Sequence, residues 1–251
     1  MAALFAAELR KLLTTRSWLW LGLAAVALTA LYASLSIAFS QVANSPVPPI
    51  TTLAGQRTLL QVGSAAEPFT AVLGALAVTG ELRHGTMVFT LLATPRRSRI
   101  LVAKMALYAA IGAAYGAICT AVALAVALPW LGTEGIHINL VANAIPATLA
   151  GVVAAAALFA VIGVGCGALV GNQVGCVVVL LTYLLVVDPL LLSIPGAWQI
   201  YLPGAAADAL TQVSEVHTRL LTAWQGGLLL LAYGALLFVG GARALAMRDL
   251  E

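Results

Sequence analysis

Charged residues are scarce in this 251-residue chain, at only 8% of the sequence. A soluble globular chain carries about 25% charged residues, so the composition excludes an ordinary soluble domain. There is no basic domain of the kind that binds nucleic acid, and we expect no nucleic-acid partner. Apolar residues make up 62% of the chain. Uncharged runs of roughly 20 residues recur, and each is long enough to cross a membrane. We therefore expect an all-α integral membrane protein.

Lysine, cysteine and histidine are also rare, and their scarcity excludes several chemistries. The only lysines are Lys11 and Lys104, and neither follows a glycine, so the chain has no phosphate-binding P-loop. The three cysteines lie in apolar runs without CxxC spacing, which indicates inert thiols rather than a disulfide framework or a zinc site. The three histidines stand far apart in the sequence. We expect no metal, no cofactor and no catalytic residue in this chain.

Six apolar segments are predicted to be membrane spans. They cover residues 18–39, 59–80, 100–130, 140–170, 174–187 and 220–240. The second is the least apolar, and it must begin near Leu59 or Leu60 to be long enough. The fifth is short, because Asp188 precedes a proline and that geometry favours the end of a helix.

The basic residues predict the orientation of these spans. With both termini inside, the cytoplasmic side holds ten Lys and Arg residues and the outer side holds the other two of the twelve. The outer two are Arg57 and Arg219. This asymmetry follows the positive-inside rule, so we expect both termini in the cytoplasm.

Residues 1–16 differ from a span. Apolar residues recur there at helical spacing, while charged residues occupy other faces. The apolar set is Leu4, Phe5, Leu9, Leu12 and Leu13, and the charged set is Glu8, Arg10, Lys11 and Arg16. This pattern predicts an amphipathic helix in the membrane interface, with its basic side chains reaching anionic headgroups. A helix continuous with the first span is the alternative.

The cytoplasmic segment after the second span, "ELRHGTMVFTLLATPRRSRILVAK", combines basic and apolar residues. Positive charge that fixes the topology would account for the arginines, but it does not account for Phe89, Leu91 and Leu92 outside the membrane. The Thr94-Pro95 pair marks a turn. We therefore expect a short helix over residues 81–94 with one hydrophobic face and charged edges.

Here the sequence resembles the permease subunits of type-2 ATP-binding-cassette (ABC-2) exporters. The matching residues are Glu81, Gly85, Thr86, Leu91, Leu92, Thr94, Pro95, Arg96, Arg99 and Lys104, and the later stretches "VVDPLL" and "YLPGAAADAL" also fit. The resemblance covers essentially the full chain. It implies one permease domain, residues 1–251, in a bacterial inner membrane.

The resemblance also implies partners. Two copies of a separate ATPase subunit would bind ATP and Mg²⁺, and a second permease, either identical or paralogous, would complete a dimer embedded in membrane lipids. Residues 81–94 would be the coupling helix that contacts the ATPase. Its contact residues would be Glu81, Leu82, Arg83, His84, Gly85, Thr86, Phe89, Leu91 and Leu92. Residues 189–223 would form re-entrant helices at the outer face.

Other residues are assigned on their own chemistry. The expected cytoplasmic anchor to headgroups consists of Arg10, Lys11, Arg16, Arg96, Arg97, Arg99 and Lys104. Glu67 either lines a pathway inside the dimer or marks the outer start of a helix, because acid and proline both suit a helix N-terminus. Asp188 either caps the following helix or lines the exit, and Tyr183 either lines the cavity or packs.

The function expected from these residues is outward movement of a hydrophobic or amphipathic substrate, such as a drug, a peptide or a lipid. A secondary transporter without an ATPase is the main alternative, although the two halves of the chain show no convincing inverted repeat. An intramembrane enzyme would need a polar cluster inside the membrane, and the sequence shows none. We also expect changes at Glu81 or Gly85 to leave folding intact but to abolish substrate-stimulated ATPase activity.

Overall fold

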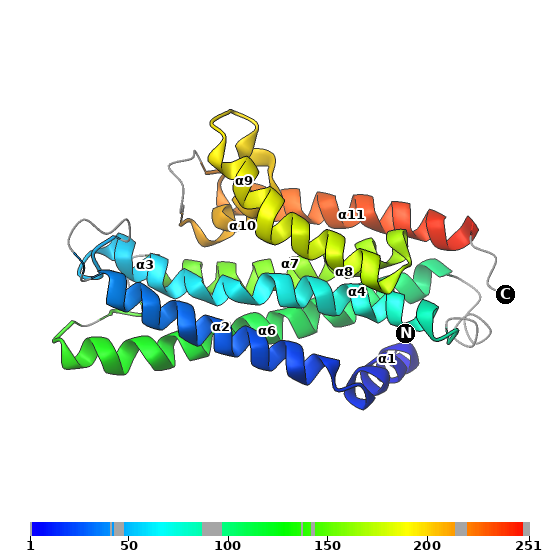
Figure 1. Ribbon diagram of the computed structural model, residues 1–251, viewed down its shortest axis with the longest axis horizontal. Coiled ribbons are helices and arrows are strands. Elements are labelled where there is room, and N and C mark those ends of the chain that lie inside the picture. The colour runs from blue at the N-terminus through cyan, green and yellow to red at the C-terminus, as the bar shows by residue number, and fades with distance from the viewer. Residues whose placement is uncertain are drawn as a thin grey trace.

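A computed structural model describes residues 2–40, 42, 48–86, 97–136, 138–141, 144–213 and 220–247. Every regular element in those residues is a helix, which confirms the all-α prediction. The α-helices are α1 (Ala2–Thr14), α2 (Ser17–Ser40), α3 (Leu53–Gln61), α4 (Glu67–Arg83), α6 (Arg97–Thr133), α7 (Ile145–Val170), α8 (Gln173–Thr182), α9 (Asp188–Ser193), α10 (Pro203–Thr211) and α11 (Ala223–Met247). Figure 1 shows the long helices side by side in one bundle.

Within the described residues, six helical segments are long and apolar enough to cross a membrane, which agrees with a multi-pass membrane protein. They are Ser17–Ser40, Leu53–Arg83, Arg99–Thr133, Ile145–Val170, Gln173–Ser193 and Ala223–Leu245. α1 is a separate helix, because the chain bends at residues 15–16 before α2 begins. The alternative of one continuous N-terminal helix is therefore wrong.

The second span begins at Leu53, several residues earlier than the sequence predicted. Thr52 caps α3 by accepting a hydrogen bond from the Gly55 N–H at 3.1 Å. Gly55 must lack a side chain, because an added Cβ would lie 2.3 Å from the Pro49 carbonyl oxygen. A short 3₁₀ helix, Val62–Ala66, then connects α3 to α4. Glu67 opens α4 in the middle of this span and is half-buried.

The fifth span does not end at Asp188, so that prediction is wrong. The helix continues from α8 through a π-helical turn, Tyr183–Val187, into α9 and ends at Ser193. A proline inside an α-helix has no N–H to donate, and its ring collides with the carbonyl four residues earlier. The wider π turn, in which the Asp188 N–H bonds the Tyr183 carbonyl, lies immediately before Pro189 and accommodates it.

α7 lies at the centre of the bundle, in contact with α4, α6, α10 and α11. Small residues allow the close approach between α7 and α4. A Cβ added to Gly163 of α7 would lie 1.9 Å from the Ala71 carbonyl oxygen of α4, and one added to Gly74 would lie 2.2 Å from the Ala160 carbonyl oxygen. The two backbones therefore touch through their glycines, as small residues permit in membrane helices.

Different helices form the two ends of the bundle (Figure 1). We call one the α1 end: it holds α1, the end of α4, the start of α6 and the end of α11. We call the other the α10 end: it holds α3, α9 and α10. Described basic residues concentrate at the α1 end, in α1, α4, α6 and α11. At the α10 end the described basic residue is Arg57.

Candidate functional site

Four charged side chains meet at the α1 end, and we call them the ion cluster: Glu8 and Lys11 of α1, Glu81 of α4 and Lys104 of α6. The Lys104 ammonium donates to a Glu8 carboxylate oxygen and, at 2.9 Å, to Glu81 Oε1. Lys11 donates to Glu8 at 2.8 Å and to the same Glu81 oxygen at 2.7 Å. Three helices that are distant in sequence are therefore joined by alternating charges.

The cluster is electrically neutral and mostly buried. Its two positive and two negative groups balance, and it contains both lysines of the chain. Lys104 is 1% exposed, Glu8 3% and Glu81 8%. Charges removed from water to this degree are tolerated only when they are paired and hydrogen-bonded. Lys104 also donates to the Ala77 carbonyl oxygen at 3.1 Å, so its ammonium has three acceptors.

Helix geometry explains the local arrangement. Residues 8 and 11 are three apart on α1 and lie on one face, which is the face that turns toward the bundle with Leu12. Leu9 and Leu13 point away from the bundle and are exposed. Burial alone would raise the pKa of Glu8, but the ammonium groups of Lys104 and Lys11 outweigh it and lower that pKa. Burial would lower the pKa of Lys11, and its bonds to Glu8 and Glu81 raise it instead.

These positions differ from the ones we expected for several residues. Lys104 and Lys11 were assigned to headgroup contacts, but Lys104 points into the bundle and Lys11 bonds two carboxylates. Glu81 was assigned to a docking surface, yet it is buried in the last turn of α4. Its loss would leave Lys104 with one fewer counter-ion, so a change at Glu81 should destabilise the fold. Arg10, Arg16 and Arg99 are exposed, as an anchor to headgroups requires.

The segment expected to couple to a partner is described only in part. Leu82 is half-buried against the core, whereas Arg83, His84, Gly85 and Thr86 are exposed beyond the ion cluster. Gly85 has a φ of 65°, which glycine adopts without strain as the chain turns out of α4. The remaining assigned residues Phe89, Leu91, Leu92 and Arg96 lie outside the described residues, as does the Arg97 side chain.

A cavity of about 420 Å³ with a mixed polar and apolar lining adjoins the ion cluster. Glu8, Lys11 and Glu81 line one part of it, and Tyr108 and Gln173 line another. The cavity therefore brings α1, α4, α6 and the start of α8 around one space at the α1 end.

Arg57 forms the corresponding centre at the α10 end. Its Nε donates to the Thr148 hydroxyl at 3.0 Å, and its Nη2 donates to the carbonyl oxygens of Thr211 and Gln212 at 2.9 and 2.8 Å. One turn along α3, Gln61 donates to the Asp208 carboxylate at 2.9 Å. These bonds join α3, α7 and α10, a junction that the sequence did not predict.

Asp188 and Tyr183 lie together in the fifth span. The Tyr183 side chain interacts with the Asp188 carboxylate, which also accepts a hydrogen bond from the Gly204 N–H at 3.3 Å. Gly204 stands in the first turn of α10, so the Asp188 carboxylate satisfies a backbone N–H that has no partner within that helix. Asp188 is 4% exposed. A role for Asp188, Tyr183 or Glu67 in a pathway stays a prediction.

Within the described residues, no group of His, Cys, Asp and Glu side chains is arranged to hold a metal ion. Cys119 and Cys176 are buried and Cys166 is half-buried, and none of the three is in a disulfide. No family model matches the chain, and no curated protein sequence matches it. Residues and geometry alone therefore carry a functional proposal.

A sequence signal for the ion cluster was present. Lys104 falls inside a predicted span and Glu81 falls at the end of another, and an ionisable residue at such a position requires a partner. Glu8 was a residue that sequence reasoning missed, because it was assigned to the charged faces of α1 although its spacing of four residues places it on the same face as Leu12. No comparable signal identified Arg57, which sits in a stretch too polar to resemble a span.

Proposed function

We propose that the chain is the membrane permease subunit of an ATP-driven exporter of the ABC-2 type. In this proposal it pairs with a second permease, identical or paralogous, and with two copies of a separate ATPase that binds ATP and Mg²⁺. The substrate is hydrophobic or amphipathic and moves outward. The α1 end faces the cytoplasm of a bacterial cell, in agreement with the concentration of basic residues there.

The ion cluster is the observation that carries the proposal. Residues 84–96 connect α4 to α6, and each of these two helices contributes one residue to the cluster, Glu81 and Lys104. Glu8 and Lys11 attach α1 to the same point. A displacement of the connecting segment would therefore move α1, α4 and α6 together. A permease driven by an external ATPase needs such a junction, because the nucleotide-dependent states must differ in how they contact the membrane helices.

Co-purification tests the proposal directly. The tagged chain is expressed with its neighbouring genes, purified in detergent, and analysed by mass spectrometry and ATPase assay. We expect an ATPase subunit in equal ratio to the permease and substrate-stimulated ATP hydrolysis. A stable oligomer of this chain that retains no ATPase would contradict the proposal and favour a secondary transporter.

A matched pair of variants tests where the ATPase binds. Phe89→Ala together with Leu92→Ala removes apolar side chains from the connecting segment, and we expect this double variant to lose the co-purified ATPase. Phe39→Ala removes an exposed aromatic side chain at the C-terminal end of α2, and this variant should retain the ATPase. Equal retention by both variants would exclude the segment as the docking site. Thermal melting of both proteins separates lost docking from lost folding.

A further inference from the structure

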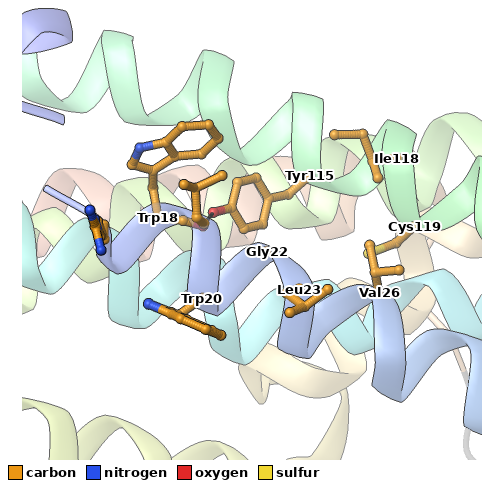
Figure 2. A pocket seen from close by; sticks show the side chains of 10 residues that line it. Trp18, Trp20, Gly22, Leu23, Val26, Tyr115, Ile118 and Cys119 are labelled. Carbon is orange, nitrogen blue, oxygen red and sulfur yellow. Dashed lines mark hydrogen bonds between the residues drawn. The ribbon is translucent and has the colours of Figure 1, made fainter. Parts of the chain in front are cut away.

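An apolar groove of about 610 Å³ runs between α2 and α6 on the outside of the bundle. Figure 2 shows Tyr115 pointing from α6 toward α2 beside Trp18, with Ile118, Cys119 and Val26 further along. The Tyr115 hydroxyl donates to the Trp18 carbonyl oxygen, which fixes the floor of the groove. Its volume lies within the range of about 300–1,000 Å³ that is usual for ligand pockets.

The absence of a side chain at Gly22 lets α2 approach Tyr115 closely at this groove. Gly22 lines it on the α2 side, and a Cβ added there would lie 3.2 Å from the Tyr115 hydroxyl oxygen. Tyr115 and Cys119 form a buried floor, at 6% and 1% exposure, while the rim residues Leu23 and Ile118 are more than half exposed. The groove is therefore open along its length to whatever surrounds the bundle.

The length and polarity of the groove match one half of a bilayer. It extends along α2 from Arg16 to Val26, which at 1.5 Å per residue is about 15 Å, half the hydrocarbon thickness of about 30 Å. Arg16 is exposed and is the one charged residue among those that line it. Trp18 and Trp20 stand next to it, and tryptophan is typical of the membrane–water interface.

Arg16, at one end of the groove, distinguishes between a lipid and a second copy of the chain as the occupant. No carboxylate is among the described residues that line the groove, so a second copy of this chain packed with the same face would bury Arg16 opposite apolar residues. Burying an unpaired guanidinium costs several kcal/mol, which disfavours that contact. A phospholipid with an anionic headgroup fits both features of the groove. Its phosphate oxygens can accept hydrogen bonds from Arg16, and its acyl chain can fill the apolar part.

The geometry points to a binding site for one acyl chain of an anionic phospholipid, with the chain over Gly22 and Tyr115 and the headgroup phosphate at Arg16. The site lies on the outside of the bundle, and its lining residues differ from those of the cavity beside the ion cluster. It would stabilise the contact between α2 and α6, and it does not depend on the presence of an ATPase.

Native mass spectrometry of the purified chain tests this site. The probes are dioleoyl phosphatidylglycerol, which is anionic, and dioleoyl phosphatidylcholine, which has the same chains and no net charge. We expect a single phosphatidylglycerol to be retained with a preference of about fivefold over phosphatidylcholine, because the choline cation compensates the phosphate charge that phosphatidylglycerol leaves for Arg16. Equal retention of the two lipids would overturn the assignment of the headgroup to Arg16.

Variants separate the two parts of the site. Arg16→Gln should abolish the preference but keep chain binding, whereas Arg10→Gln, which removes an exposed arginine outside the groove, should change neither. Gly22→Leu fills the groove from α2 and should abolish retention of both lipids. Ile118→Trp fills it from α6 and replaces Gly22→Leu if that variant fails to fold.

Two outcomes would contradict the proposal outright. One is wild-type lipid retention by folded Ile118→Trp and Gly22→Leu proteins. The other is a dimer that retains no phosphatidylglycerol and dissociates when the groove is filled, because that result would assign the face to a second copy of the chain.

Discussion

Lys104 at the α1 end and Arg57 at the α10 end each connect three helices, but their partners are of different kinds. Lys104 bonds two carboxylates and one carbonyl, within a group that also contains Lys11. Arg57 bonds a hydroxyl and two backbone carbonyls. One end therefore balances charge with charge, and the other satisfies a cation with neutral oxygens.

This difference has an energetic consequence. Removing one member of a buried ion pair leaves its partner charged in a poorly solvated site, and the cost exceeds the loss of the bonds themselves. Removing a cation that bonds neutral oxygens leaves no uncompensated charge. The α1 end should therefore be the more sensitive end to single charge changes, and the α10 end should tolerate them better.

The largest effect is expected for Lys104→Gln. It leaves Glu8 and Glu81 buried with Lys11 as their shared counter-ion, and the free energy of unfolding should fall by about 3–5 kcal/mol. Unfolding in mixed detergent and SDS micelles measures this change. Arg99→Gln, which removes an exposed cation five residues earlier on α6, is the control and should alter stability little. Equal effects of the two variants would remove Lys104 from the centre of the junction.

A smaller fall in the free energy of unfolding is expected for Arg57→Gln. The glutamine amide can keep part of the bonding to Thr148 and Thr211, so only part of the stabilisation is lost. Each hydrogen bond to a charged group contributes about 1.5–3 kcal/mol. The same unfolding assay applies. A loss as large as that of Lys104→Gln would contradict the contrast between the two ends.

A change of pH is expected to have the smallest effect on the stability of the protein. Glu8 has a lowered pKa, so its stabilisation is complete above its ordinary value of 4.5 and is lost as the pH falls through the lower folded value. Lys11 has a raised pKa, so its contribution is complete below 10.5 and is lost above that value. Thermal melting should show a plateau between these limits. Glu8→Gln should reduce the decline on the acid side, and an unchanged decline would mean that other carboxylates cause it.

The helical content and the number of spans were predictable because long uncharged runs have few alternatives to a membrane helix. The start of the second span was not. The polar residues Gln56 and Arg57 left residues 53–58 outside the predicted span, yet Arg57 and, one turn later, Gln61 are hydrogen-bonded to α7 and α10. Hydropathy measures each residue alone and does not register a partner 91 or 147 residues away.

The ion cluster was missed for the same reason. Lys104 and Glu81 were visible as charges next to apolar runs, but the residue that completes the set, Glu8, lies 96 positions from Lys104. Pro189 led to a different error, because the sequence predicted that the fifth span would end just before it. It correctly marked a disturbance of the helix, but the π turn absorbs that disturbance and the span continues.

A double-mutant cycle on Glu8 and Lys104 tests the central claim, that α1 is held to the bundle through the ion cluster. The free energy of unfolding is measured for the wild type, Glu8→Gln, Lys104→Gln and the double variant. If the two side chains are paired, their effects should be non-additive, with an interaction energy above about 1 kcal/mol. Additivity within about 0.5 kcal/mol would show that the pair does not form and would contradict the account.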